Sequence, residues 1–197
     1  FFYFKEGGRV SAMANLGMFN PNFEFTGTRP LVAAKKYVGG KYDNFMVYLY
    51  AKRADALWNH VRQNKKTGAT EAYSRYVGLH PDDAKRIISE VEQKHKGFVE
   101  AGKIFWEWQE GFLDHIAQIS PYYAEIVNRM RASDPGFYVP LGADFASMDS
   151  AARSGASNLN SLKKGLKGSG VKRKNPIEGV LDNAREMLRK AGHRAVM

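Results

Sequence analysis

The chain of 197 residues contains no cysteine, and this absence excludes several kinds of site at once. Without thiols there can be no disulfide framework, no metal site built on thiolates and no cysteine nucleophile. No apolar run approaches the length of about 18 residues that suggests a membrane-spanning helix, so we expect no membrane span. The start, Phe1-Phe2-Tyr3-Phe4-Lys5, has no basic region ahead of an apolar one and is not the pattern of a signal peptide. Because an initiating methionine is missing and the last residues continue a helical pattern, we expect a piece of a longer protein.

The sequence also lacks a recognisable catalytic or metal-binding motif. Its histidines, at positions 60, 80, 95, 115 and 193, include no pair four residues apart and no H-E-x-x-H. We therefore expect no metal and no cofactor, and we expect the histidines to lie at the surface or on the flanks of helices. His95 differs because it replaces an apolar residue on a helical stripe, and we expect it to be a hydrogen-bonded interior histidine.

Acidic residues are scarce relative to basic ones. The formal net charge is +10 and the sequence pI is about 9.7, a balance that favours nucleic acid, an anionic membrane surface or an acidic protein as partner. No acidic residue occurs between Asp149 and Glu178. The basic residues in that interval are Arg153, Lys163, Lys164, Lys167, Lys172, Arg173 and Lys174.

Two interpretations of the segment 153–174 remain open. Lysines on a glycine-rich backbone can neutralise phosphates without reading base sequence, which favours contact with DNA. A solvated linker is the alternative. Within the segment, Gly165–Lys172 superficially resembles a phosphate loop, but it lacks G-x-x-x-x-G-K-[ST] and no clear strand precedes it. The sequence therefore does not support a nucleotide-hydrolysing site.

The strongest secondary-structure signal is a stripe of apolar residues that recurs at steps of three and four from Ala84 to Ile116. Pro81 suits a first helical position, and two aspartates follow it near the positive end of the helix dipole. If unbroken from His80 to Ile119, this helix would measure roughly 55–60 Å at about 1.5 Å per residue. We therefore predict one very long helix that acts as a scaffold.

Weaker signals divide the rest of the chain. Asp43 or Asn44 can cap one helix, and Ser120 with Pro121 can open another that turns back on the long one. The first 42 residues are rich in glycine and aromatics, with a turn at Asn20-Pro21-Asn22, and their aromatics must pack on the helices or on a neighbouring chain. The predicted fold is all-α, an elongated antiparallel helical array. Its parts are an irregular aromatic arm (1–42), a helical body (43–134), an extended segment with the basic linker (135–175) and a C-terminal helix (176–197).

Acidic and aromatic side chains on the long helix invite a functional interpretation. Glu107, Glu110 and Asp114 are about one turn apart, and paired carboxylates can cleave glycosidic bonds. Nearby lysines on the same helix are typical of a solvated face, so we expect none of the three acids to be catalytic. Trp106 lies on the apolar stripe and is predicted to be core, whereas Trp108 lies off it and suggests a second contact face.

Several segments occur in a familiar serial order. Asp43-Asn44-Phe45-x-x-Tyr48-Leu49-x-Ala51-Lys52-Arg53-Ala54 is followed by Pro81-Asp82-Asp83-Ala84, by Asp134-Pro135-Gly136-x-Tyr138-Val139-Pro140-Leu141, by Lys167-Gly168-Ser169-Gly170 and by Asn175-Pro176-Ile177-Glu178. This order, which covers residues 40–197, resembles the large polyvalent protein-associated domains found in very large proteins of tailed phages. The sequence departs from that pattern after Leu141, where Gly142-Ala143-Asp144 replaces an aromatic or basic continuation.

The resemblance implies a non-catalytic module of a large protein that is packaged in the virion and delivered with the genome. It carries over no catalytic residue to this chain, because the family has no established active site to map onto it, and enzymatic domains lie elsewhere in such proteins. The implied partners are other parts of the same protein or neighbouring virion proteins, and the implied locations are the virion interior and then the infected bacterial cell. A sequence-independent DNA-binding module that uses the segment 153–174 is the alternative function, and a homo-oligomer is a further possibility.

Overall fold

The computed structural model describes residues 6–63, 80–133, 136, 139 and 176–195. Within these residues the structure is helical, which confirms the predicted all-α class, and the only strand-like pairing is an isolated antiparallel bridge between Phe19 and Phe25. None of the described helices combines the length and apolar character that crossing a membrane requires. The elements are α1 (Glu6–Leu16), the 3-10 turn η1 (Leu31–Ala33), α2 (Ala34–Val38), α3 (Tyr42–Gln63), α5 (Pro81–Lys94), α6 (Gly97–Ile119), α7 (Pro121–Ser133) and α10 (Pro176–Ala195).

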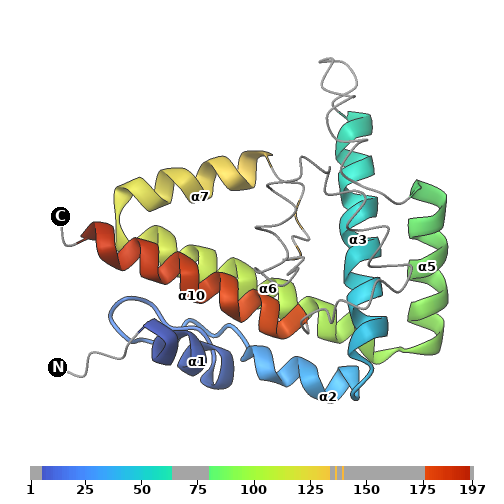
Figure 1. The fold of residues 1–197 in the computed structure, drawn as a ribbon, viewed down its shortest axis with the longest axis horizontal. Coiled ribbons are helices and arrows are strands. Elements are labelled where there is room, and N and C mark those ends of the chain that lie inside the picture. The colour runs from blue at the N-terminus through green and yellow to red at the C-terminus, as the bar shows by residue number, and fades with distance from the viewer. Residues whose placement is uncertain (1–5, 64–79, 134–135, 137–138, 140–175, 196–197) are drawn as a thin grey trace, which may run out of the picture.

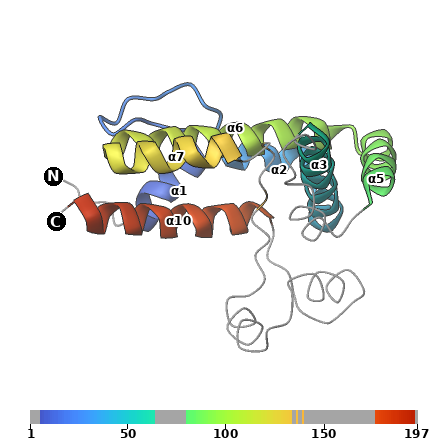
Figure 2. The same ribbon diagram turned by 90° about the horizontal axis from the view of Figure 1, so that it is seen from above.

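The helix α6 is the central element of the fold (Figure 1). It contacts α2, α7 and α10, while α1 packs against α10. Helices α3 and α5 form an antiparallel pair that stands across one end of α6, and Figure 2 shows this pair nearly end-on. Helix α10 lies beside α6 and runs in the same direction. The elongated antiparallel array that the sequence predicted is not confirmed, since α10 and α6 run in the same direction.

The single very long helix predicted over residues 80–119 is wrong, because two helices occupy this stretch. Helix α5 ends at Lys94, and His95 leaves the helical conformation with φ −136° and ψ 70°. Helix α6 then starts at Gly97 in a new direction (Figure 1). Only two residues separate the helices, so apolar residues keep nearly the same spacing across the break and the periodicity did not reveal it.

The break has a physical cause in the packing of Gly97 against α2. A Cβ atom at this position would lie 2.6 Å from the backbone oxygen of Tyr37, closer than real Cβ atoms approach. The lack of a side chain therefore allows the first turn of α6 to press against the carboxyl end of α2. Glycine is also a poor helix former, which makes it a favourable place for one helix to stop and another to begin.

The first 42 residues were predicted to be an irregular arm with one short strand or helix, and the described part contains more helix than that. Residues 6–16 form α1, and α2 precedes α3. The buried residues Val10, Met13 and Leu31 belong to the same hydrophobic core as α6 and α10. The glycines and aromatics of this region masked its helical content, because α1 begins with the weak helix formers Gly7 and Gly8.

Trp106, predicted to be core, is less buried than Trp108, which was predicted to mark a second contact face. Trp108 is fully buried, stacks on Phe112 and donates its Nε1–H to the backbone oxygen of Met13 at 3.1 Å. Trp106 is only partly buried. The reason is that α1 and the loop after it cover a second face of α6, so the stripe shared with α5 is not the only buried surface.

The predicted helix starts are confirmed in two places and shifted in one. His80 caps α5 by accepting from the backbone N–H of Asp82 at 3.4 Å, and Pro81 is the first helical residue. Ser120 precedes α7 and accepts from the N–H of Tyr123 through both its side chain and its backbone oxygen. Helix α3, by contrast, begins at Tyr42, so neither Asp43 nor Asn44 is its cap.

Candidate functional site

The basic residues predicted to contact DNA lie outside the described residues, as does the glycine-rich stretch 165–172 within their segment. Those residues are Arg153, Lys163, Lys164, Lys167, Lys172, Arg173 and Lys174. The candidate functional residues that the structure does describe are the carboxylates of α6, two histidines and an aromatic loop.

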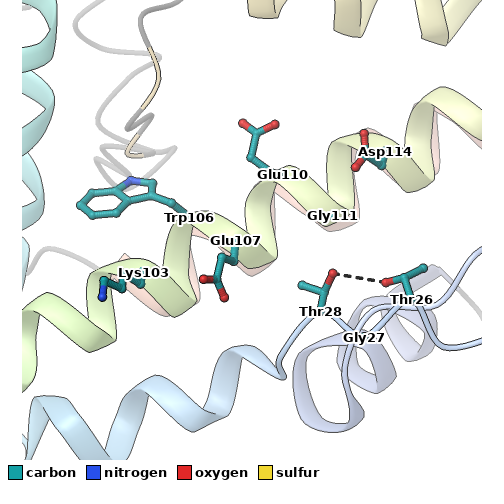
Figure 3. Close-up of a pocket in the computed structure, with 9 residues that line it drawn as sticks. All are labelled: Thr26, Gly27, Thr28, Lys103, Trp106, Glu107, Glu110, Gly111 and Asp114. Carbon is teal, nitrogen blue, oxygen red and sulfur yellow. Dashed lines mark hydrogen bonds between the residues drawn. The ribbon is translucent and has the colours of Figure 1, made fainter.

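The carboxylates of α6 line a shallow, open groove (Figure 3). One wall is the loop segment Thr26–Thr28, where the two threonine hydroxyls lie 3.2 Å apart. The loop approaches closely because Gly111 has no side chain, and a Cβ there would lie 2.9 Å from the Thr28 hydroxyl. Lys103, Trp106, Glu107, Glu110 and Asp114 supply the rest of the lining.

Two arginines hold these carboxylates in ion pairs. Arg29 pairs with Glu100 and, at 2.7 Å, with Glu107. Arg131 of α7 lies 2.9 Å from Glu110 and 2.7 Å from Asp114. The side chains of Glu107, Glu110 and Asp114 are 51%, 56% and 57% exposed, so water screens them and they are not desolvated. The pairs join α6 to the loop before η1 through Arg29 and to α7 through Arg131.

The ion pairs shift the pKa values of Glu100 and of both arginines. The hydrogen bond from Arg29 is the main cause that lowers the pKa of Glu100 from its usual value. The hydrogen bonds to Glu100 and Glu107 raise the pKa of Arg29, and the hydrogen bond to Asp114 raises that of Arg131. A general acid requires the opposite shift, a raised carboxyl pKa near the working pH. The shift at Glu100 is in the other direction.

His95 occupies the corner between α5 and α6. Its ring stacks on Phe98 with centroids 4.7 Å apart. Its two nitrogens lie 3.5 Å from Nζ of Lys41 and 3.4 Å from the side-chain amide of Asn44. The residue is therefore hydrogen-bonded, as predicted, but it is half-buried at a helix end and not interior.

His115 is the residue that sequence reasoning missed. It was expected at the surface or on a helix flank, yet it is 2% exposed and packs edge-on against Phe19. Burial is the main cause that lowers its pKa to about 4, and the nearby charge of Arg9 acts in the same direction. The available signal was its position one turn from Phe112 and next to Ile116, which places it on the buried face of α6.

The loop between α1 and η1 exposes two aromatic side chains. Phe23 is 60% exposed and Phe25 is 66% exposed, and Leu16 at the end of α1 is 65% exposed. Phe23 adopts a φ of 66°, in the left-handed region that bulky residues rarely occupy. Its ring stacks on Phe19 and lies under the guanidinium of Arg9. The turn predicted at Asn20-Pro21-Asn22 is present here.

No protein-family model matches the chain, and no curated protein or solved structure is significantly similar to it. Among the residues that the structure describes, no three His, Asp or Glu side chains are grouped so that they could hold a metal ion. The resemblance to phage domains therefore stays a prediction that rests on the sequence motifs.

Proposed function

We propose that the chain is a non-catalytic structural and interaction module of a large bacteriophage internal protein that is delivered with the genome. The serial order of the motifs supports the phage assignment. The observation that supports the non-catalytic part is that each of the four carboxylates on the open face of α6 forms an ion pair with Arg29 or Arg131. The implied partners are other parts of the same protein or neighbouring virion proteins, and copies of the chain could also associate with one another.

The location of the protein provides the test. Peptides from this chain should appear in purified particles of the phage that encodes it, and they should resist added protease until the particles are opened. After infection the same peptides should be recovered from the bacterial cell. Peptides that are absent from the particles, or digested before opening, would show that the protein is not an internal virion component.

Sequence-independent DNA binding is a second candidate function, and the distribution of charge favours it. The described residues contain 19 Lys and Arg against 16 Asp and Glu, so the folded helices are close to neutral. Residues 140–175 contain seven basic residues against two acidic ones. A segregated positive segment can neutralise phosphates and release counterions, which gives binding that weakens steeply with salt.

A binding titration tests this second candidate. The purified chain is mixed with a labelled duplex of arbitrary sequence over a range of salt concentrations. Replacement of the basic residues of the segment 153–174 by glutamine should weaken binding and flatten its salt dependence. Each phosphate contact contributes about 0.9 to the slope of the logarithm of the binding constant against the logarithm of the salt concentration. Unchanged affinity and unchanged slope would rule out the segment as the contact.

A further inference from the structure

Three segments that together carry five lysines meet where α2 ends, α3 begins and α5 gives way to α6 (Figure 1). All five are exposed. We call this surface the lysine corner, and it consists of Lys35, Lys36, Lys41, Lys94 and Lys96.

Specific contacts hold the segments of the lysine corner together. The first residue of α6, Gly97, is pressed against the backbone oxygen of Tyr37, which is next to Lys36. Nζ of Lys41 lies 3.5 Å from a ring nitrogen of His95, the residue between Lys94 and Lys96. The segments that carry these lysines are therefore held together by the fold and do not depend on the conformation of a linker.

The lysines of the lysine corner are not paired with acidic side chains of the described residues. None of its five lysines forms an ion pair with a described residue, whereas cations elsewhere do, such as Arg86 with Asp83 and Lys52 with Glu92. Asp43, in the first turn of α3, is the acidic residue nearest along the chain to Lys41. The amino end of α6 also lies here, and its dipole adds partial positive charge.

We propose that the lysine corner binds the phosphate backbone of duplex DNA. The inference rests on the DNA contact proposed above but assigns a second, separate set of residues to it. Lysine provides a point charge without a fixed fork of donors, which suits backbone contacts that do not depend on sequence.

The composition of the surface favours duplex DNA over two other polyanions. Membrane-surface binding combines cations with inserted aromatic or large apolar side chains, and single-strand binding stacks bases on aromatic rings. In the described part of this corner no aromatic side chain is exposed, and Tyr37 is half-buried under Lys36. The exposed aromatics Phe23 and Phe25 are on a different loop.

The test compares two variants of the full chain in the salt-dependent duplex titration. The corner variant carries glutamine at all five lysines. The matched control replaces five cations that are held in ion pairs elsewhere, namely Lys103, Arg129, Arg185, Arg189 and Lys190. We expect the corner variant to bind at least about tenfold more weakly at low salt, with a slope reduced by about 0.9 for each lost phosphate contact. The control, with the same net charge, should lose much less.

Each other outcome has a definite meaning. Equal losses in the corner and control variants would overturn the inference, because only net charge would then matter. Loss of binding on neutralising the segment 153–174, with none in the corner variant, would overturn it and leave DNA binding by the segment intact. Corner-dependent binding to phosphatidylserine vesicles, with none to DNA, would overturn it in favour of a membrane contact. No DNA binding by the unmodified chain would remove both proposals.

Circular dichroism checks that the corner variant is folded. If it is not, two smaller variants, Lys35→Gln with Lys36→Gln and Lys94→Gln with Lys96→Gln, replace it in the same titration. Each smaller variant should lower the affinity for DNA and its salt dependence by part of the amount expected for the corner variant. Unchanged binding in both would overturn the inference.

Discussion

His115 of α6 donates its Nδ1–H to the backbone oxygen of Phe19 at 2.8 Å, across 96 residues of sequence. Its other ring nitrogen lies 3.3 Å from a guanidinium nitrogen of Arg9, which can only donate. The ring is therefore neutral, with its proton on Nδ1. One buried histidine in this state joins α1, the loop after it and α6.

We expect this contact to make stability depend on pH. Burial lowers the pKa of His115 to about 4, whereas a histidine in the unfolded chain titrates near 6.5. Between these values the unfolded chain binds a proton that the native state does not, so the free energy of unfolding falls as pH falls through this window. The expected loss from pH 7 to pH 5 is about 2 kcal/mol, measured by urea unfolding.

The control for this prediction is His115→Asn. The asparagine amide can still donate to the oxygen of Phe19, but it does not titrate in this range. This variant should be less stable than the parent at pH 7, and its stability should change less between pH 7 and pH 5. An identical pH dependence in both proteins would show that His115 is not the responsible group.

The sequence predicted features that depend on neighbouring residues in the chain. The cap at Ser120 follows from local hydrogen bonding, and Pro81 and Pro121 both stand at the first position of a helix. These signals involve a few adjacent residues, so they can be read without knowing the fold.

The features that the sequence did not predict depend on contacts between distant residues. The break before Gly97 depends on a close approach by Tyr37, and the burial of Trp108 depends on α1. His115 is buried because the loop carrying Phe19 closes over it. None of these partners lies on the same stretch of helix, so periodicity could not identify them. The DNA-binding residues of the segment 153–174 stay a prediction, since they lie outside the described residues.

Trp108→Phe should destabilise the protein far more than Trp106→Phe. The first change removes the hydrogen bond to Met13 and leaves unfilled volume in the core, which together cost about 2–3 kcal/mol. Trp106 is only partly buried, so its replacement should cost about 1 kcal/mol or less. Urea unfolding of both variants measures the difference. A larger loss for Trp106→Phe than for Trp108→Phe would support the prediction from the apolar stripe that Trp106 is the core side chain.

Gly97→Ala should destabilise the protein although alanine is the better helix former. Alanine gains about 1 kcal/mol of helix propensity, but its Cβ would meet the backbone oxygen of Tyr37 at 2.6 Å. The first turn of α6 or the end of α2 must then move, and we expect a net loss of about 1–3 kcal/mol. Thermal and urea unfolding measure this change.

Gly7→Ala is the matched control for the substitution at Gly97. Gly7 also lies in the first turn of a helix, but a Cβ there would meet nothing within 4 Å. This change should leave stability unchanged or raise it by about 0.5 kcal/mol. A stabilising effect at both positions would mean that the contact between Gly97 and Tyr37 does not constrain the corner.

The last prediction concerns the loop that holds Phe23 in its left-handed conformation. The side-chain oxygen of Asn20 accepts from the backbone N–H groups of Asn22 and Glu24 at 2.9 and 3.0 Å, and its amide donates to the Glu24 carboxylate at 2.7 Å. A left-handed φ costs a non-glycine residue about 1–2 kcal/mol, so these bonds must offset it. Asn20→Ala should therefore lower the free energy of unfolding by about 1–2 kcal/mol.

Asn20→Asp separates the two functions of that side chain. Aspartate can accept the same two backbone hydrogen bonds, but it sets a second carboxylate beside Glu24 in place of a donor. At neutral pH the Asn20→Asp variant should be less stable than the parent. Added salt should reduce this difference in stability, because the two carboxylates are exposed and salt screens their repulsion. Asn20→Ala should show no such salt dependence. If both variants respond to salt alike, the bond to Glu24 does not hold the loop, and the backbone hydrogen bonds carry the conformation of Phe23.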